Sequence, residues 1–333
     1  MKTALFWHKT ESANVQCELC PHHCVLKEGR TGLCRIRHVR DGELKAGGYG
    51  LISSLHVDPI EKKPLYHFYP TSDIFSIGGW GCSLACKFCQ NWTISQNLDE
   101  RSESREPDEV IQAASRHHSV GVAYTYNEPL INIEFVHDCA VIAREHGLVN
   151  VLVTNGFIEE PPAAHLLPFI DALNIDIKSM DDKFYRKECK GTLDPVLRFC
   201  QQAVAAGCHV EITNLLIPNL NDTEEQVSKL SGWIGKNLGR KTPLHLSAYR
   251  PEFKMNLPPT AVETLEQVHG VCSRDLDYVY IGNARTRSGQ DTRCPQCQAE
   301  WIVRQGYATT IVGLVDHACA QCGRHADIVF SRT

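Results

Sequence analysis

The chain has 333 residues, with 34 Lys and Arg against 39 Asp and Glu, which gives a formal net charge of -5 at pH 7. With 43% hydrophobic and 22% charged residues, its composition is that of a globular protein and excludes a largely disordered one. The acidic balance supplies no overall positive field for DNA or an acidic membrane surface. The opening MKTALFWHKT is too short in apolar residues for a secretory signal, and no run of 18 apolar residues follows, so we expect a cytoplasmic protein without a membrane partner.

The sixteen cysteines are unevenly distributed, and eleven of them fall into three short groups. In a reducing compartment, clustered cysteines favour metal binding over disulfides. The five scattered cysteines are interpreted as small buried hydrophobic residues; they are Cys139, Cys189, Cys200, Cys208 and Cys272.

Residues 1–50 are rich in Cys, His, Gly and Arg and show no sustained periodicity. We therefore expect a small module that is held together by a metal and not by a hydrophobic core. Four cysteines within eighteen residues would bind that metal, with His22 and His23 as alternative ligands; the four are Cys17, Cys20, Cys24 and Cys34. Their spacing is compatible with either zinc or an iron–sulfur cluster.

Between residues 74 and 281, short apolar runs alternate with longer amphipathic ones. Strands are predicted at 74–78, 121–126, 150–154, 172–177, 209–217, 244–248 and 278–281, and the clearest helices at 107–117, 132–146, 195–206 and 223–237. This alternation predicts an α/β protein with a parallel sheet, either a complete or partial barrel or an open doubly wound sheet. Polar residues cluster where these strands end, so we expect them to surround one pocket.

A central triplet, Cys82, Cys86 and Cys89, follows the first of these strands directly. Three thiolates bind three irons of a cubane cluster and leave the fourth iron open, whereas structural zinc recruits a fourth ligand. The neighbouring sequence offers no such ligand. The triplet therefore predicts a metal centre with an open position, which is what chemistry requires.

The CxxxCxxC loop, with Phe88 before its third cysteine, resembles the radical S-adenosylmethionine (SAM) superfamily. More narrowly, GCSLACKFCQNW followed by TYNEP (125–129), TNG (154–156), DIK (176–178) and NLLIPNLND (214–222) resembles the activating enzymes of pyruvate formate-lyase. With the N-terminal CxLCPHHC and two C-terminal CxxC pairs, the whole chain is similar to the radical enzyme of the AmmeMemoRadiSam system.

This resemblance implies a partial (β/α)6 barrel and a 4Fe–4S cluster on the central triplet, with SAM on the open iron. The enzyme would reductively cleave SAM to a 5′-deoxyadenosyl radical, which abstracts hydrogen from an unidentified substrate. The electron would come from a one-electron donor such as flavodoxin or ferredoxin. The substrate class stays open among a small molecule, a peptide and a glycine in a partner enzyme, the last being the reaction of a glycyl-radical-enzyme activase.

The resemblance also carries over residues that would hold SAM, while no catalytic residue is assigned. They are Asn127 and Glu128, which match the segment that holds the methionyl amino group; Asn155 and Gly156 of the next segment; Asp176 and Lys178, which match the DxK that faces the ribose or carboxylate; and Asn214, which with His245 would line the substrate side. One departure is that the activating enzymes commonly carry a GGE-type segment where this chain has Tyr126-Asn127-Glu128.

At the C terminus, Cys294, Cys297, Cys319 and Cys322 have the paired CxxC spacing of a zinc ribbon, with ribbon strands expected at 301–303 and 310–312. Tetrahedral zinc would replace the core that so small a module lacks, and an auxiliary iron–sulfur cluster is the alternative. The predicted domains are therefore a four-cysteine module (1–50), a barrel (51–284) and a ribbon-like module (285–333).

A different class of function is a zinc-containing protein that binds nucleic acid or a partner protein through its ribbon. Residues 285–333 carry six Arg and Lys against four Asp and Glu, too balanced for a strong phosphate-binding surface. Nucleic acid is therefore not expected as a partner, and a purely structural protein gives no reason for a three-cysteine centre.

Overall fold

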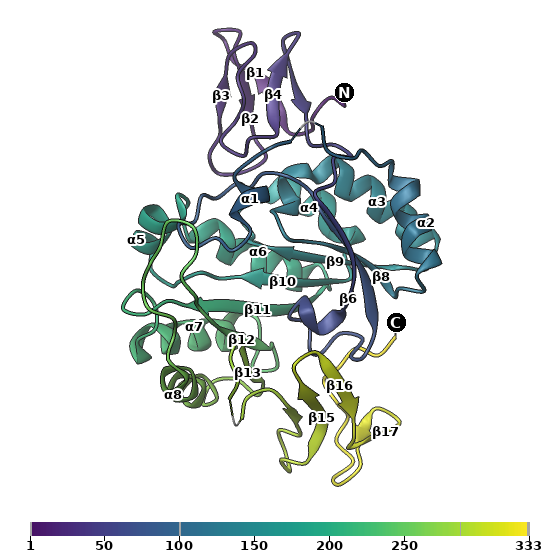
Figure 1. Cartoon of the computed structure of the whole chain (residues 1–333), viewed down its shortest axis with the longest axis vertical. Coiled ribbons are helices and arrows are strands. Elements are labelled where there is room, and N and C mark those ends of the chain that lie inside the picture. The colour runs from purple at the N-terminus through teal and green to yellow at the C-terminus, as the bar shows by residue number, and fades with distance from the viewer. Residues whose placement is uncertain (1, 100, 287, 332–333) are drawn as a thin grey trace.

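A computed structural model describes residues 2–99, 101–286 and 288–331. Its centre is one eight-stranded sheet in the order β13-β12-β11-β10-β9-β8-β7-β6, in which β7 to β13 are parallel and β6 is antiparallel to β7 (Figure 1). The strands are β6 (Ser54–Pro59), β7 (Asp73–Gly78), β8 (Gly121–Tyr124), β9 (Val149–Thr154), β10 (Ala172–Asp176), β11 (His209–Leu216), β12 (Leu244–Ala248) and β13 (Val279–Gly282). The strand order is linear, with β6 and β13 as the two edges.

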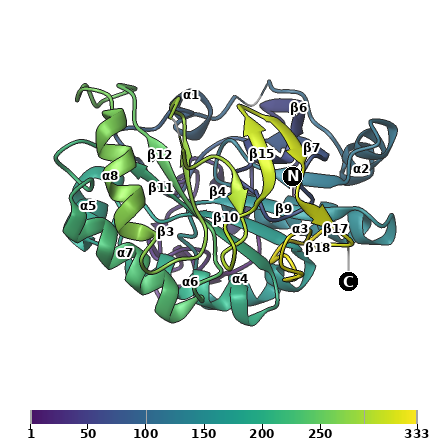
Figure 2. The ribbon, with the colours of Figure 1, turned by 90° about the horizontal axis from the view of Figure 1, so that it is seen from below.

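Helices join the parallel strands and lie along the outer face of the sheet, as Figure 2 shows. The α-helices are α1 (Trp92–Ser95), α2 (Pro107–Arg116), α3 (Ile133–Glu145), α4 (Glu160–Leu166), α5 (Asp182–Phe184), α6 (Asp194–Ala205), α7 (Glu224–Asn237) and α8 (Val262–Cys272). Three short 3-10 turns and one π-helical segment complete them: η1 (Ile60–Lys62), η2 (Pro129–Asn132), η3 (Leu167–Phe169) and the π-helical η4 (Tyr185–Cys189). No helix of the described chain is long and apolar enough to cross a membrane.

Local sequence explains the main elements. Strands β8 and β10 are buried almost throughout, as expected for parallel strands covered on both faces. Helix α2 begins with a capping box, in which Glu106 and Glu109 each accept a backbone N–H at the helix start, and Pro107 occupies the first turn.

The α/β fold predicted from the sequence is confirmed. The seven predicted strands correspond to β7 to β13, and the four predicted helices to α2, α3, α6 and α7. The sheet contains seven parallel strands where a (β/α)6 barrel has six, together with β6, which the sequence analysis did not predict.

The N-terminal module forms two small sheets at the top of Figure 1. Its strands are β1 (Trp7–Lys9), β2 (Val15–Cys17), β3 (Val25–Leu26), β4 (Arg37–Arg40) and β5 (Glu43–Ala46). Val15, Leu19, Ile36, Val39 and Leu44 are buried and belong to the same hydrophobic core as the barrel. The expectation that metal would stand in for a core was therefore wrong here, because the module shares the core of its neighbour.

The C-terminal module lies at the opposite end of the molecule (Figure 1). It contains β14 (Thr292–Arg293), β15 (Glu300–Gln305), β16 (Ala308–Ile311), β17 (Leu314–Val315) and β18 (Ala318–Cys319), so the two predicted ribbon strands are confirmed as β15 and β16. Trp301 and Ile302 form a separate small core with Tyr66, Tyr278 and Tyr280 of the barrel. The module is thereby fixed to the amino end of the parallel strands.

Candidate active site

The CxxxCxxC loop begins where β7 ends, at the carboxyl edge of the sheet. The sulfur of Cys82 accepts hydrogen bonds from the backbone N–H of Leu84 at 3.3 Å and from Nδ2 of Asn155 at 3.4 Å. The sulfur of Cys89 lies 3.2 Å from the hydroxyl of Ser95. Hydrogen bonds to the sulfur atoms influence the reduction potential of a metal–thiolate centre. These polar contacts would therefore act on a metal bound by the loop.

Burial raises the pKa of Cys82 well above its ordinary value, and the carboxyl of Glu128 nearby raises it further. A hydrogen bond with Cys189, followed by burial, does the same to the pKa of Cys86. These thiols therefore stay protonated in the metal-free chain, and a bound metal would take the place of the proton.

The π-helical segment η4 supports the loop from one side, a contact that sequence reasoning did not find. The N–H of Ala85 donates to the carbonyl of Cys189 at 2.8 Å, and Lys87 contacts Glu188 both through its N–H, at 3.0 Å to the carbonyl, and through an ion pair of 3.1 Å. The sequence analysis interpreted Cys189 as a small buried hydrophobic residue. It is buried, but its thiol also lies beside that of Cys86. A π-helical turn at a functional site is a recurring device, but the sequence carries no local signal for it.

The side-chain amide of Asn127 forms hydrogen bonds with the backbone of the cysteine loop. Its Oδ1 accepts from the N–H of Gly79 at 2.8 Å, and its Nδ2 donates to the carbonyls of Trp80 at 3.0 Å and Gly81 at 3.2 Å. Both ends of this amide are therefore occupied by the loop backbone, so Asn127 fixes the path of the chain just before Cys82.

Glu128 is buried and connects the ends of β8 and β9. Its carboxylate accepts from the hydroxyl of Thr154 at 2.6 Å and from the N–H groups of Asn155 at 2.8 Å and Leu130 at 3.0 Å. Burial raises the pKa of Glu128 to about 7, although these three hydrogen bonds act to lower it. The group is therefore poised to change charge near neutral pH.

Asn155 and Gly156 lie directly beside the loop. Besides its contact with the sulfur of Cys82, Asn155 accepts the N–H of Phe157 through Oδ1 at 2.9 Å. Gly156 has a φ of +66°, and a Cβ there would lie 3.0 Å from the ring of Phe199. Both the backbone angle and the close packing therefore require glycine at this position.

Asp176 ends β10 and pairs with Lys178 at 2.7 Å. Burial acts to lower the pKa of Lys178, but the charge of Asp176 and the hydrogen bond with its carboxylate raise it above its ordinary value. Lys178 is thus a cation held close to the cysteine loop, which fits a centre of negatively charged thiolates.

Asn214 and His245, which the sequence analysis had grouped on the substrate side, lie on neighbouring strands, where His245 is in register with Thr213. Asn214 lies in the second half of β11 and donates to the carbonyl of Ile177 at 2.7 Å, while its buried Oδ1 has no partner within the described chain. His245 is the second residue of β12 and contacts Glu211 at 2.6 Å. His245 therefore contacts Glu211, whereas Asn214 contacts the backbone that follows β10.

A segment after β12 reaches over the cysteine loop. The N–H of Lys254 donates to the carbonyl of Lys87 at 2.9 Å. Trp92 donates through Nε1 to Glu252 at 3.1 Å and stacks on Phe253 with ring centres 5.2 Å apart. These contacts cover part of the loop and border the carboxyl end of the barrel.

The four cysteines of the N-terminal module come together on one side of that module. The thiol of Cys20 lies near enough to Cys17, Cys24 and Cys34 for their charges to raise its pKa, after burial as the main cause. Arg37 lies beside Cys17 and Cys34, and its side chain is fully buried with an ion pair of 3.0 Å to Glu134.

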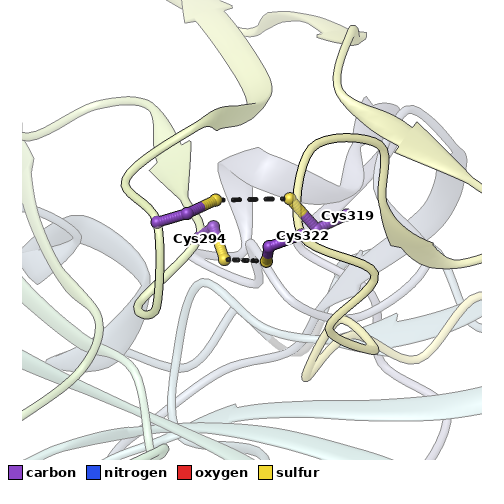
Figure 3. Close-up of side chains that lie close together, drawn as sticks. Cys294, Cys319 and Cys322 are labelled. Carbon is purple, nitrogen blue, oxygen red and sulfur yellow. Dashed lines mark hydrogen bonds between the residues drawn. The ribbon is translucent and has the colours of Figure 1, made fainter.

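The four C-terminal cysteines converge much more tightly, and Figure 3 shows their sulfurs facing one another in pairs. The sulfurs of Cys294 and Cys322 are 3.6 Å apart, as are those of Cys297 and Cys319, and all four lie within 4.8 Å of one another. Tetrahedral zinc with bonds of about 2.3 Å to sulfur requires sulfurs about 3.8 Å apart. The site therefore has the size of a single tetrahedral ion.

The central triplet fits a cluster better than a single ion. Within residues 2–99, 101–286 and 288–331, only the C-terminal set brings three or more His, Cys, Asp or Glu ligand atoms within 4.8 Å of one another. The sulfurs of Cys82, Cys86 and Cys89 are therefore spread wider than one ion allows. An iron–sulfur cluster, which places several atoms between its thiolates, matches such a spacing.

Comparison with known proteins agrees with this geometry. The sequence profile described as "Radical SAM superfamily" matches residues 77–230. An uncharacterised protein of Methanocaldococcus jannaschii is 45% identical over 99% of this chain and 100% of its own length. The pyruvate formate-lyase 1-activating enzyme of Escherichia coli is 23% identical over 57% of this chain and 85% of its own length.

Among solved structures, a radical SAM methyltransferase from Sphaerobacter thermophilus has a TM-score of 0.51 and 18% identity, covering 66% of this chain and 68% of that one. At this identity the likeness concerns the fold alone. Profile, relatives and fold agree with the loop at the end of β7, and the chain belongs to the radical SAM superfamily, as a relative of the pyruvate formate-lyase activating enzymes.

Proposed function

We propose that this protein reductively cleaves SAM at a 4Fe–4S cluster and uses the resulting 5′-deoxyadenosyl radical to abstract hydrogen from a substrate. The observation that carries the proposal is the set of three thiols at the carboxyl end of β7, in which the sulfur of Cys82 has two hydrogen-bond donors and that of Cys89 contacts the hydroxyl of Ser95. When bound, the cluster and SAM supply the electron transfer and bond cleavage. Membership in the superfamily supports this assignment.

In this proposal the residues around the loop position the thiolates. Asn127 holds the backbone before Cys82 through three hydrogen bonds, and Asn155 donates to the sulfur of that cysteine. The cation of Lys178 offsets the negative charge of the thiolates. The contact of Trp92 with Glu252 ties the segment after β12 to this end of the barrel.

We assign the contacts with SAM to four side chains and one backbone segment. Glu128, with a pKa near 7, would accept the methionyl amino group, and its proton state would follow that contact. The pair of Asp176 and Lys178 would face the ribose or carboxylate. Asn214 offers a buried oxygen without a partner in the described chain, and the backbone at Gly156 is assigned to the same site.

The remaining parts of the proposal concern partners and organisation. A one-electron donor such as flavodoxin or ferredoxin would reduce the cluster, and we place the protein in the cytoplasm. We keep the division into modules at 1–50, 51–284 and 285–333, with zinc in the last, because four sulfurs within 4.8 Å support a single tetrahedral ion.

The decisive test is anaerobic formation of 5′-deoxyadenosine from SAM by reconstituted, dithionite-reduced protein. The Cys86→Ala variant is expected to lose product formation by at least 100-fold, whereas Cys189→Ala, which removes the neighbouring thiol, is expected to retain it. A fully loaded central cluster that neither binds SAM nor yields product would overturn the proposal. Equal loss in Cys189→Ala, with loss of iron, would mean a closed four-cysteine site.

The relationship to pyruvate formate-lyase activating enzymes supports a second candidate, activation of a glycyl radical enzyme by hydrogen abstraction from a glycine. Deuterated cell extract, divided by size, separates the two substrate classes. Deuterium that enters 5′-deoxyadenosine only from the protein fraction would favour the activase, and transfer only from the small-molecule fraction would exclude it. Resemblance to the AmmeMemoRadiSam radical enzyme stays a prediction, since none of the relatives described above carries that name.

A third candidate, a zinc-ribbon protein that binds nucleic acid or a protein partner, has weaker support. Its ribbon is fixed against the barrel through Tyr278 and Tyr280, and no observation favours it over an enzyme.

A further inference from the structure

The four N-terminal cysteines surround one site. The N–H of Cys17 donates to the carbonyl of Cys24 at 3.0 Å across the β2–β3 hairpin, which places Cys20 in the turn between them. A Cβ at Gly32 would lie 3.7 Å from the sulfur of Cys24 and 3.8 Å from that of Cys34. The four thiols thus come from one hairpin and the loop that follows it.

This site lacks the compact geometry of the C-terminal one. All sixteen cysteines belong to the described residues, and the N-terminal four include no three whose sulfurs lie within 4.8 Å of one another. Single tetrahedral zinc requires sulfurs about 3.8 Å apart. Four thiolates at a wider spacing match an iron–sulfur cluster, which four cysteines commonly hold.

The surroundings of these thiols suit a negatively charged centre. Backbone N–H groups donate to three of the sulfurs: those of Leu19 to Cys17, of His22 to Cys20, and of Ile36 and Arg37 to Cys34. The guanidinium of Arg37 is buried, and its Nε–H has no acceptor in the described part of the chain. Such donors and a buried cation stabilise a thiolate cluster and set its potential.

The site also touches the central loop. Nε2 of His22 donates to the carbonyl of Ser83 at 2.7 Å, and a Cβ at Gly81 would lie 2.3 Å from the carbonyl oxygen of Cys34. Gly81 and Ser83 are the two neighbours of Cys82. Direct backbone contact therefore links the N-terminal thiols to the first ligand of the central triplet.

We propose that Cys17, Cys20, Cys24 and Cys34 bind a second iron–sulfur cluster, which passes electrons to the central cluster. The transfer moves one electron: a reduced flavodoxin- or ferredoxin-type donor reduces the N-terminal cluster, which is reoxidised as the central cluster gains that electron. No bond or proton changes in this exchange. The presence of the cluster is independent of the proposed function, while its relay role rests on it.

The first test removes the central triplet from the full-length chain, as Cys82→Ala/Cys86→Ala/Cys89→Ala. After anaerobic reconstitution, this variant is expected to retain roughly two to four irons with equal sulfide, and about one zinc, per chain. Dithionite should give an electron paramagnetic resonance signal that a further Cys20→Ala change abolishes. The matched control Cys272→Ala, in the buried face of α8, should leave the metal content unchanged. About two zinc and no iron in the triplet variant would overturn the proposal.

The second test compares fully reduced wild type with the triplet variant and with Cys17→Ala/Cys20→Ala. Two clusters close enough for this transfer should give a wild-type resonance spectrum broadened by their magnetic interaction, and not the sum of the two single-cluster spectra. A simple sum would overturn the relay. Failure of wild type to cleave SAM, with both clusters present and interacting, would count against the proposed function and leave the second cluster in place.

Discussion

A cysteine-rich module and a buried glutamate lie at each end of the parallel strands. The surroundings of the two glutamates shift their pKa values in opposite directions. At the amino end, Glu211 accepts hydrogen bonds from His209, His245 and two backbone N–H groups. Burial acts to raise the pKa of Glu211, yet the two histidines hold it well below its ordinary value. At the carboxyl end, the three hydrogen-bond donors to Glu128 are neutral, and its pKa rises to about 7.

This difference indicates that the amino end stabilises the fold and that the carboxyl end holds the functional site. At the amino end, the carboxylate of Glu211 has hydrogen-bond partners, and the C-terminal module covers this end. Arg304 of that module donates to the hydroxyl of Thr292 at 2.7 Å and to the carbonyl of Tyr66 at 3.0 Å. The carboxyl end has a glutamate whose pKa is raised to about 7 and, within the residues that the structure describes, an oxygen of Asn214 without a partner. Barrels of parallel strands place their chemistry at the carboxyl end, and perturbed groups gather at such sites.

The largest effect is expected from removal of the C-terminal four-cysteine site, for which we proposed zinc. In Cys294→Ala/Cys297→Ala, residues 292–322 should lose their protection from hydrogen exchange, because structural zinc contributes about 10–16 kcal/mol to the folding of such modules. Hydrogen exchange in β9 and β10 should stay slow, because the central sheet is expected to remain folded. Unchanged protection of β15 and β16 would show that the small core around Trp301 suffices without metal.

The two buried glutamates should differ in how much stability is lost when each is replaced by a neutral residue. Glu211→Gln is expected to lower the free energy of unfolding by about 3–5 kcal/mol, because a group that pairs with buried partners is lost. Glu128→Gln should cost less than about 1 kcal/mol at pH 7, since the amide keeps one acceptor and the carboxyl is already partly neutral. Denaturant titration of both variants measures this. A cost at Glu128 equal to that at Glu211 would remove the contrast between the ends.

The pH dependence of stability sharpens the same contrast. Because folding raises the pKa of Glu128 from 4.5 to about 7, the folded protein binds more protons there than the unfolded chain in this window. Its contribution to stability is complete below pH 4.5 and falls by about 3 kcal/mol as the pH rises to 7. Unfolding titrations at several pH values should show this slope in wild type and not in Glu128→Gln. The same slope in the variant would assign it to another group.

The smallest effect concerns the contact between the N-terminal module and the cysteine loop. Gly81 has a φ of +79°, and a Cβ there would lie 2.3 Å from the carbonyl oxygen of Cys34. Gly207 has a φ of +83° with nothing within 4 Å. Gly81→Ala should therefore destabilise the protein by about 1–3 kcal/mol more than Gly207→Ala, the cost of overpacking beyond backbone strain. Equal losses of unfolding free energy in the two variants, measured by denaturant titration, would show that the N-terminal module moves away from residue 81 without destabilising the protein.

Much of the fold could be predicted from local sequence, because each parallel strand is a continuous apolar run and each crossover helix has its own periodicity. Strand β6 was missed because it is an edge strand with exposed His56 and Val57. The triplet itself was identified by spacing, and Glu128, Asn155 and Lys178 do lie around the loop.

Contacts between distant segments could not be predicted in this way. Cys189 meets Cys86 only through the π-helical turn, and His245 joins Glu211 across two strands. The N-terminal module lacks a visible periodicity because its buried residues complete the core of the barrel. Single-sequence patterns report which residues are buried along one element, and not which element covers them.

The ion pair between Arg37 and Glu134 also constrains the order in which the protein is made. The two residues are 97 positions apart, and both side chains are fully buried. At a synthesis rate of about 5–20 residues per second, roughly 5–20 seconds separate the appearance of Arg37 from that of its partner. Arg37 thus reaches its buried contact only after Glu134 has been made, and until then the neighbouring thiols of Cys17 and Cys34 lack the shielding of that contact.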